Sequence, residues 1–310
     1  MDYFLQLFLR QSKYVKALII LVVILLAVLA ILTFSNHRYL PNWDKIGTAL
    51  FGSNETEVTE DYIRFINVGQ GDSVLISSNG YNALVDFGNK SDYGNGLLEK
   101  LRSYGIKELD CIFVSHYDED HVGGGAMLLD AMKVHYAVLP EQADRGEEPF
   151  PDFQYALENN GTEVCIAQVG TLINIGDFNI TVIGYYRGET EPNDRSIVLM
   201  AELFGKKFLL TGDAGEAVEQ NLIIDRINLD CDVLKVAHHG SRGSTTETFV
   251  AATTPRYAVI SAGPSNAYGH PHQEVLNVLN NANVQICRTD RNGDITFRVE
   301  NGRLNLETEY

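Results

Sequence analysis

The sequence predicts a mixed α/β protein (α+β in its detailed order) whose sheets are covered by helices, preceded by one apolar helix near the N-terminus. Three observations support this class. From about Asp61, short apolar runs typical of strands alternate loosely with helical stretches, and glycines punctuate the turns between them. Apolar residues make up 45% of the 310 residues, which is enough for one large domain or two small ones. A separate, uninterrupted apolar segment lies near the N-terminus.

The N-terminal segment Ala17–Phe34 is eighteen residues long, carries no charge and has one polar side chain, that of Thr33. This length is sufficient for a transmembrane helix. We therefore expect a signal anchor over residues 14–35, after a short cytoplasmic N-terminus over residues 1–13. A cleaved signal peptide is the competing interpretation, but its apolar core is normally shorter and no clean small-x-small cleavage site follows. A buried soluble helix is favoured least, because such helices are seldom apolar on every face.

The charge distribution predicts an acidic domain outside the membrane. Arg10, Lys13 and Lys16 precede the apolar segment, which favours a cytoplasmic N-terminus by a small margin over the basic residues that follow it. The formal charge of the chain is −17, and the first 35 residues contribute +2, so the remainder carries −17 − 2 = −19. This balance argues against nucleic-acid binding by a broad basic surface. We expect a single-pass protein of the cell membrane with its domain outside.

A polar linker is expected over residues 36–60, followed by one domain over residues 61–310. In the first half of this domain, strands flank the turn Gly69–Asp72 and the Asn79-Gly80 pair, which is a favourable hairpin turn. The expected strands are Tyr62–Val68, Ser73–Ser77, Ala83–Asp86, Cys111–Ser115 and Tyr136–Pro140, and the expected helices are Gly94–Tyr104 and Gly124–Met132.

The second half of the domain repeats this alternation of strands and helices. Two helical stretches are expected, near Glu216–Asp225 and Glu274–Asn280. The expected strands are Glu163–Gln168, Thr171–Ile175, Phe178–Ile183, Ser196–Leu203, Lys207–Thr211, Val233–Ala237, Tyr257–Ser261, Gln285–Arg288 and Ile295–Val299.

The four cysteines do not resemble a zinc site. Cys111, Cys165, Cys231 and Cys287 are far apart along the chain and form no CxxC pair. Each lies in or beside an apolar, strand-like run, so we expect small buried hydrophobic side chains. An exported location permits disulfides, but the spacing does not favour one.

The strongest functional signal is Val114–His121 (VSHYDEDH), which is followed by Val122 and three glycines. An apolar strand leads directly into His116, Asp118, Asp120 and His121. Imidazole and carboxylate groups bind divalent metals, and the end of a strand holds them rigidly. The glycines allow a tight turn into the next helix. A loop that is acidic by chance is the alternative, and the combination argues against it.

Two further clusters follow apolar strands in the second half of the domain. Thr211–Gly215 (TGDAG) places Asp213 after one strand, and Ala237–Ser241 (AHHGS) places His238 and His239 after the next. Either cluster alone would more often be an ordinary turn. Together they put an acid and a histidine pair at the ends of successive strands, as expected of a site assembled on one sheet edge.

These motifs, H-x-D-x-D-H, T-G-D-x-G and A-H-H-G-S, resemble the metallo-β-lactamase family, in the branch that includes the extracellular hydrolase domain of ComEC-type DNA-uptake proteins. The resemblance covers about Tyr62 to Ile295 and implies a four-layer αβ/βα sandwich with a dinuclear metal site at the sheet edges. Further matching segments are FINVGQGDS (Phe65–Ser73), LVDFG (Leu84–Gly88), NDRSIV (Asn193–Val198), YGHP (Tyr268–Pro271) and RTDRNGD (Arg288–Asp294).

The resemblance also implies a set of metal ligands. One metal would use His116 and Asp118, and the other Asp120 and His121, with Asp213 bridging the two. Either His238 or His239 would complete the second site, and we favour His239. Asp120 and Asp213 would thereby also be catalytic.

Two departures from the wider superfamily bear on the metal. Asp118 stands where histidine is usual, and Asn193-Asp194 lies where a separate histidine is expected. Both features are typical of the ComEC-like branch. They replace nitrogen ligands by oxygen, which favours Mn²⁺ or Mg²⁺ relative to a purely zinc site. We expect two divalent ions, manganese or zinc, with magnesium as a further option.

Other residues are expected in supporting roles. His270 would contact the substrate phosphate or protonate the leaving oxygen, although a structural turn histidine is nearly as well supported. Asp86 would orient a ligand histidine, and Asp72 would either face the site or form its turn. Asn193 and Ser241 are further candidates for contacts to the ligands or the substrate, and a plain loop is the safer interpretation of Ser241.

The expected function is that of a membrane-anchored extracellular hydrolase, a phosphodiesterase or nuclease that uses a metal-activated water. Its substrate would be DNA or a phosphodiester polymer of the envelope, such as a teichoic-acid- or choline-type ester. A non-catalytic accessory of the DNA-uptake machinery is the alternative from a different class. ComEC-type proteins carry a many-helix channel, which one apolar span cannot form alone. β-Lactam hydrolysis is disfavoured by Asp118 and the absent third-motif histidine.

Overall fold

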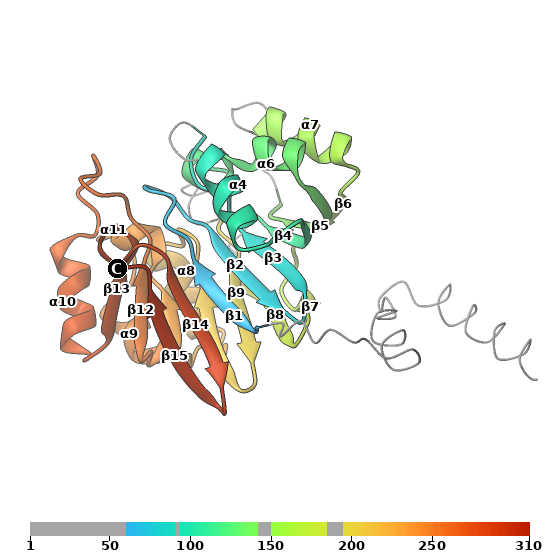
Figure 1. The fold of residues 1–310 in the computed structure, drawn as a ribbon. Coiled ribbons are helices and arrows are strands. Elements are labelled where there is room, and N and C mark those ends of the chain that lie inside the picture. Colours follow the sequence, from blue (N-terminus) through green and yellow to red (C-terminus); the bar gives the residue numbers. More distant parts are fainter. Residues whose placement is uncertain (1–59, 91–93, 142–149, 185–194) are drawn as a thin grey trace, which may run out of the picture. The chain divides into compact units, whose positions relative to one another are not determined.

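The computed structural model describes residues 60–90, 94–141, 150–184 and 195–310, which form two β-sheets with helices packed on them (Figure 1). The expected signal anchor and linker lie outside these residues, so they and the domain boundaries stay predictions. Among the helices that the structure describes, none is long and apolar enough to span a membrane.

The first sheet has eight strands in the order β15-β14-β1-β2-β3-β4-β5-β6. The pairs β3-β4, β4-β5 and β5-β6 are parallel, and the other pairs are antiparallel. Their bounds are β1 Tyr62–Phe65, β2 Val74–Ser78, β3 Tyr81–Val85, β4 Glu108–Phe113, β5 Lys133–Leu139, β6 Glu163–Ile166, β14 Ile295–Glu300 and β15 Arg303–Thr308.

The second sheet has seven strands in the order β13-β12-β11-β10-β9-β8-β7. Here β10 to β13 are parallel and β7 to β10 are antiparallel, so each sheet combines a parallel half with an antiparallel half. The bounds are β7 Leu172–Ile175, β8 Phe178–Gly184, β9 Val198–Leu203, β10 Lys206–Leu210, β11 Val233–Lys235, β12 Tyr257–Ile260 and β13 Gln285–Arg288.

Helices cover the outer face of each sheet, which gives the order helix, sheet, sheet, helix (Figure 1). On the first sheet, apolar side chains of α4, α6 and α7 pack on the strands; on the second, those of α8, α9 and α10 do so. The helices are α4 Gly94–Ser103, α5 Glu119–Val122, α6 Gly125–Ala131, α7 Phe150–Asn160, α8 Glu216–Ile224, α9 Glu247–Thr253, α10 Gln273–Asn281 and α11 Thr289–Asn292, with a 3₁₀ turn η2 at Ala237–Gly240.

The central core lies between the two sheets. Successive side chains of a strand point to opposite faces, so Cys111 and Phe113 of β4 enter this core while Ile112 faces the helices. Phe208 of β10 lies fully buried in the central core, with ring centroids 6.2 Å from those of both Phe178 and Phe297. The contact between Phe208 and Phe297 of β14 joins the two sheets. Strands that are buried on both faces also account for the near-continuous apolar runs in the sequence.

The structure differs from the sequence-based expectation at several elements and at one cysteine. The elements that were not expected are helices α5, α7, α9 and α11, the 3₁₀ turn η2 and strand β15. Strand β15 follows an Asn301-Gly302 turn with the same positive φ angles as the predicted Asn79-Gly80 turn, so the signal for this hairpin was present. Cys165 is exposed rather than buried, because β6 is the edge strand of its sheet; the other three cysteines are buried, and all four are free.

Replacing Phe208 by alanine is expected to destabilise the protein by about 3–5 kcal/mol, because it opens a cavity between the sheets. Phe204, which is 58% exposed in the turn before β10, provides a matched control whose replacement by alanine should change stability by less than about 0.5 kcal/mol. Urea unfolding of the full-length variants measures both values. Equal effects of the two substitutions would contradict this account of the core.

Candidate metal centre

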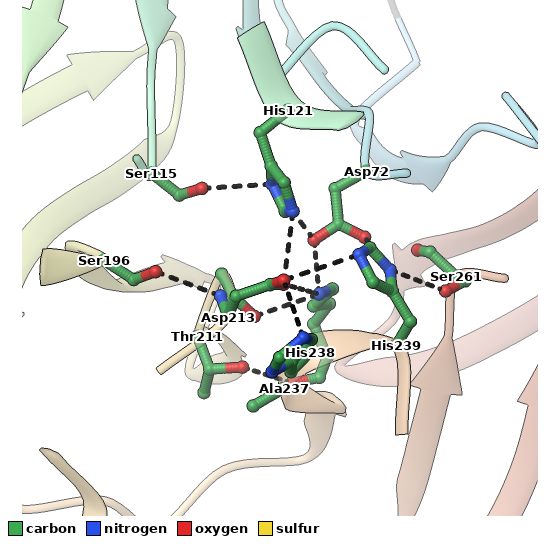
Figure 2. A network of polar contacts seen from close by, with 12 residues as sticks. Asp72, Ser115, His121, Ser196, Thr211, Asp213, Ala237, His238, His239 and Ser261 are labelled. Atoms are coloured by element: carbon green, nitrogen blue, oxygen red, sulfur yellow. Dashed lines mark hydrogen bonds and ion pairs between the residues drawn. The ribbon is translucent and has the colours of Figure 1, made fainter. Parts of the chain in front are cut away.

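The predicted clusters converge where strand ends of the two sheets meet. His116 and His121 follow β4 of the first sheet, whereas Asp213 follows β10 and His239 follows β11 of the second. Asp72 comes from the loop between β1 and β2. Figure 2 shows the side chains of Asp72, His121, Asp213, His238 and His239 directed toward one another.

His121 is held by a carboxylate on one side and faces the centre on the other. Its Nδ1 lies 2.8 Å from Asp86 Oδ2, and Asp86 also accepts hydrogen bonds from the backbone N–H and the hydroxyl of Ser115 at 2.7 and 2.6 Å. A carboxylate at Nδ1 places the proton there and leaves the Nε2 lone pair available. That Nε2 is 3.2 Å from Asp213 Oδ1. The structure thus puts Asp86 where it fixes the ring of His121.

His239 is arranged in the same way by a backbone carbonyl. Its Nδ1 donates to the carbonyl oxygen of Ser261 at 3.0 Å, so Nε2 carries the lone pair. Nε2 lies 3.1 Å from Asp120 Oδ2 and 3.5 Å from Asp213 Oδ2. His239 is buried, whereas the side chain of His238 is 32% exposed and its Nε2 is 3.8 Å from Asp213. The geometry therefore favours His239 over His238 as a ligand.

The two histidines owe their placement to an unusual backbone. His238 and His239 have φ angles of 50° and 54°, in the left-handed region that residues other than glycine rarely adopt. Such conformations persist only where the surrounding structure enforces them, and they gather at functional sites. The backbone N–H of His238 donates to Gly212 at 3.2 Å, which ties this turn to the loop that carries Asp213.

The side-chain atoms that face the centre fit a metal ion. Within the described ranges, Nε2 of His116, His121 and His239 and Oδ1 of Asp213 are buried without a hydrogen-bond partner. Buried polar atoms are normally satisfied, so such a group needs an explanation. Three-residue groups with donor atoms within 4.8 Å of one another are His116–His121–Asp213, Asp120–His121–His239, Asp72–Asp213–His239 and Asp72–Asp86–His121. Imidazole with carboxylate is a donor set for divalent transition metals.

The formal charge of the side chains at the centre also favours divalent cations. Five carboxylates, those of Asp72, Asp86, Asp118, Asp120 and Asp213, accompany the single ammonium of Lys235, which gives −5 + 1 = −4. Two divalent cations would balance this charge. Burial raises the pKa of Asp213, but the protonated forms of His239 and His121, which a bound cation would replace, outweigh it and hold that pKa well below its ordinary value.

The structure also describes the other predicted site residues, which are His116, Asp118, His270 and Ser241. The His116 ring is 4.1 Å from that of His121, and its Nε2 is 3.5 Å from the 44%-exposed carboxylate of Asp118, which belongs to none of the four donor groups above. The His270 ring lies 5.6 Å from His238. Ser241 donates its backbone N–H to the carbonyl of His238 at 2.8 Å. Asn193 lies outside the described residues, and the ligand roles of the others stay predictions.

Lys235 is a residue of the centre that the sequence analysis did not find. It sits fully buried in β11, where its ammonium group contacts the Asp72 carboxylate and donates to the carbonyl of Gly212 at 3.1 Å. Burial lowers the pKa of Lys235, but Asp72 and Asp213 outweigh it and raise that pKa above its ordinary value. The available signal was a lysine inside an otherwise apolar central strand. Asp72 is accordingly buried and faces the site.

Three serines also escaped the sequence analysis. Ser115 joins Asp86 to the histidines of the first sheet, and the Ser196 hydroxyl accepts a hydrogen bond from the backbone N–H of Asp213 at 3.1 Å. Ser261 contributes its carbonyl to His239. Single serines at strand ends are too common for the sequence to mark them.

This geometry defines a class of protein, a sandwich of two helix-covered sheets with histidines and aspartates gathered at the edges where the sheets meet. The sequence matches the metallo-beta-lactamase superfamily over residues 66–263, and the chain belongs to that superfamily. The ComEC-type resemblance is confirmed by its relatives. ComE operon protein 3 of Bacillus subtilis is 33% identical over 78% of this chain, and Competence protein ComA of Neisseria gonorrhoeae and Recombination protein 2 of Haemophilus influenzae are each 29% identical over 78%.

The alignments cover 34%, 33% and 29% of those three proteins, so this chain spans about a third of the length of the curated relatives it matches. Among solved structures, CmlA of Streptomyces venezuelae, a diiron beta-hydroxylase, superposes with a TM-score of 0.54 at 11% identity, over 82% of this chain and 59% of CmlA. This likeness supports the fold.

Replacing Asp86 by asparagine is expected to weaken metal binding about 10- to 100-fold, because His121 loses the carboxylate that fixes its ring. Isothermal titration with Mn²⁺ and Zn²⁺ measures the affinity. Asp177→Asn, an exposed aspartate in the turn before β8, is the matched control and should bind as the wild type does. Unchanged affinity in Asp86→Asn would show that this contact does not orient the histidine for a metal.

Replacing Lys235 by methionine is expected to destabilise the fold by about 3–5 kcal/mol, since it leaves the Asp72 carboxylate buried without its partner. Urea unfolding measures the change, and the double variant with Asp72→Asn should recover part of it. Lys90→Met, which removes a half-exposed lysine paired with Asp152, should change stability by at most about 1 kcal/mol. Equal losses in the two lysine variants would refute the buried pair as a determinant of stability.

Proposed function

We propose that this chain is a metal-dependent phosphodiesterase that cleaves nucleic acid with the help of two divalent cations. The observation that carries the proposal is the carboxylate-rich donor set around His116, His121 and His239, which combines nitrogen ligands with an excess of oxygen. Oxygen donors suit hard cations such as Mn²⁺, which in turn suit phosphate oxygens.

The proposed ligand set divides side chains of the centre between two cations. One cation would be held by Asp120, His121 and His239, the other by His116 and Asp118, with Asp213 between them. When bound, the cations supply a nucleophilic hydroxide near neutral pH and neutralise charge on the attacked phosphate. The chain's own part is to fix the ligands. Asp86 and the Ser261 carbonyl hold protons at Nδ1 of His121 and His239, and Lys235 neutralises Asp72 beneath them.

His270 would act on the substrate. Burial, together with the neighbouring His239 and His238, lowers the pKa of His270 to about 4. Its imidazole is therefore neutral at pH 7 and able to donate a hydrogen bond to a phosphate oxygen.

The names of the relatives support nucleic acid as the substrate. One of them is named a competence protein and another a recombination protein. We extend this to a role of the present chain in DNA uptake, as a single-pass membrane protein with residues 61–310 outside the cell and the DNA-uptake machinery as its partner. An envelope phosphodiester is the competing substrate, and a non-catalytic accessory is the competing role.

The test is hydrolysis of single-stranded DNA and of bis(p-nitrophenyl) phosphate by the full-length protein with Mn²⁺. Asp120→Ala should reduce both activities more than about 100-fold, because it removes a proposed ligand, and EDTA should abolish them. Asp130→Ala, an exposed aspartate of α6, is the matched control and should retain wild-type rates.

Three other outcomes separate the alternatives. Cleavage of the small ester alone would point to an envelope phosphodiester. Binding of metal without hydrolysis of either substrate would support the accessory role and overturn the enzyme. Activity that survives in Asp120→Ala would show that the reaction does not occur at this centre.

A further inference from the structure

The aromatic ring of Tyr268 is exposed to solvent beside His270, near the metal centre. Tyr268 is 66% exposed, although its ring is stacked on that of His270, with centroids 5.6 Å apart and an angle of 21° between the planes. The His270 ring is in turn stacked on that of His239 at 6.3 Å and 27°. The three rings thus form a short series of roughly parallel planes that leads from a donor of the centre to solvent.

The turn that carries Tyr268 is fixed on both sides. Asn266 donates to the carbonyl oxygens of Gly263 and His270 at 3.0 and 2.7 Å and accepts from the backbone N–H of His270 at 2.9 Å. Pro271 packs against Gly240, where a Cβ atom would approach it to 2.5 Å. The turn is therefore docked on the loop that carries His238 and His239, and the backbone is held on both sides of Tyr268.

We propose that Tyr268 is a stacking platform for a nucleobase beside the scissile phosphate, and that the centre therefore acts on single-stranded nucleic acid. This rests on the proposed function. An aromatic ring backed by His270 presents a π-face to solvent, and bases stack on such faces whatever their sequence. In a duplex the bases are already stacked on one another, so a platform of this kind selects unpaired strands.

The charge of the chain makes such a contact valuable. At a formal charge of −17, the net charge of the chain opposes binding of a polyanion, whereas most single-strand-binding proteins follow the backbone with a basic groove. Stacking does not depend on charge, so it adds affinity that the acidic surface cannot provide. A preorganised ring also loses little conformational freedom on binding.

Binding experiments test the platform directly. Fluorescence anisotropy would compare a labelled thymidine 12-mer with an abasic strand of the same length, which keeps the phosphates and lacks the bases. The full-length protein is used with Ca²⁺ in place of Mn²⁺, and a gel verifies that the strands stay intact. The variants are Tyr268→Ala, Tyr268→Phe, which keeps the ring, and Tyr155→Ala, which removes an equally exposed tyrosine of α7.

We expect Tyr268→Ala to bind the thymidine strand about 5- to 150-fold more weakly and the abasic strand unchanged. Tyr268→Phe and Tyr155→Ala should bind both strands as the wild type does. The platform is overturned if the wild type does not distinguish the two strands, or if Tyr268→Ala loses affinity for both equally. Tyrosine-dependent binding without cleavage of either strand under Mn²⁺ would support the platform while overturning the phosphodiesterase.

Discussion

The carboxylate of Asp213 lies within 3.2–3.5 Å of the Nε2 atoms of His121 and His239 and 4.0 Å from the ammonium group of Lys235, and its side chain is almost fully buried. Much of the surrounding structure depends on this concentration of charge. A buried ion is destabilising unless every partner is in place. Asp86, Asp72 and the serines that hold the histidines are therefore parts of one network rather than independent neighbours, and a change in one alters the environment of all.

The network also explains why two sheets are needed. His121 comes from the first sheet and Asp213 and His239 from the second, so their distances depend on the apolar contact around Phe208 between the sheets. Neither sheet alone could bring these groups together. The left-handed backbone at His238 and His239 is tolerated because Gly212 on one side and Pro271 on the other hold that turn in place.

Clusters of ligand-type side chains that are close along the chain could be predicted from the sequence. Contacts between residues that are far apart in the chain could not. The clusters around His116, Asp213 and His239 could be predicted, because each follows an apolar strand within a few residues. The metallo-β-lactamase fold was implied by the resemblance of these motifs to a known family. The sequence analysis missed Lys235, because the carboxylate that pairs with its buried ammonium group belongs to Asp72. That residue lies more than 160 residues earlier in the chain. The resemblance favoured His239 over His238, but the contact that holds its ring, with the carbonyl of Ser261 after β12, could not be predicted from the sequence. Helix α9 is too short for its periodicity to stand out, although Thr246 caps it.

Lys235 also has a consequence for how the protein survives without its proposed cations. A lysine is a counter-charge that no chelator can remove, so Asp72 stays neutralised in the interior whatever the metal supply. The sheets are joined by apolar side chains rather than through the centre. Loss of the proposed cations should consequently lower the stability of the fold without separating the two sheets, so the ligands would stay assembled for a new ion.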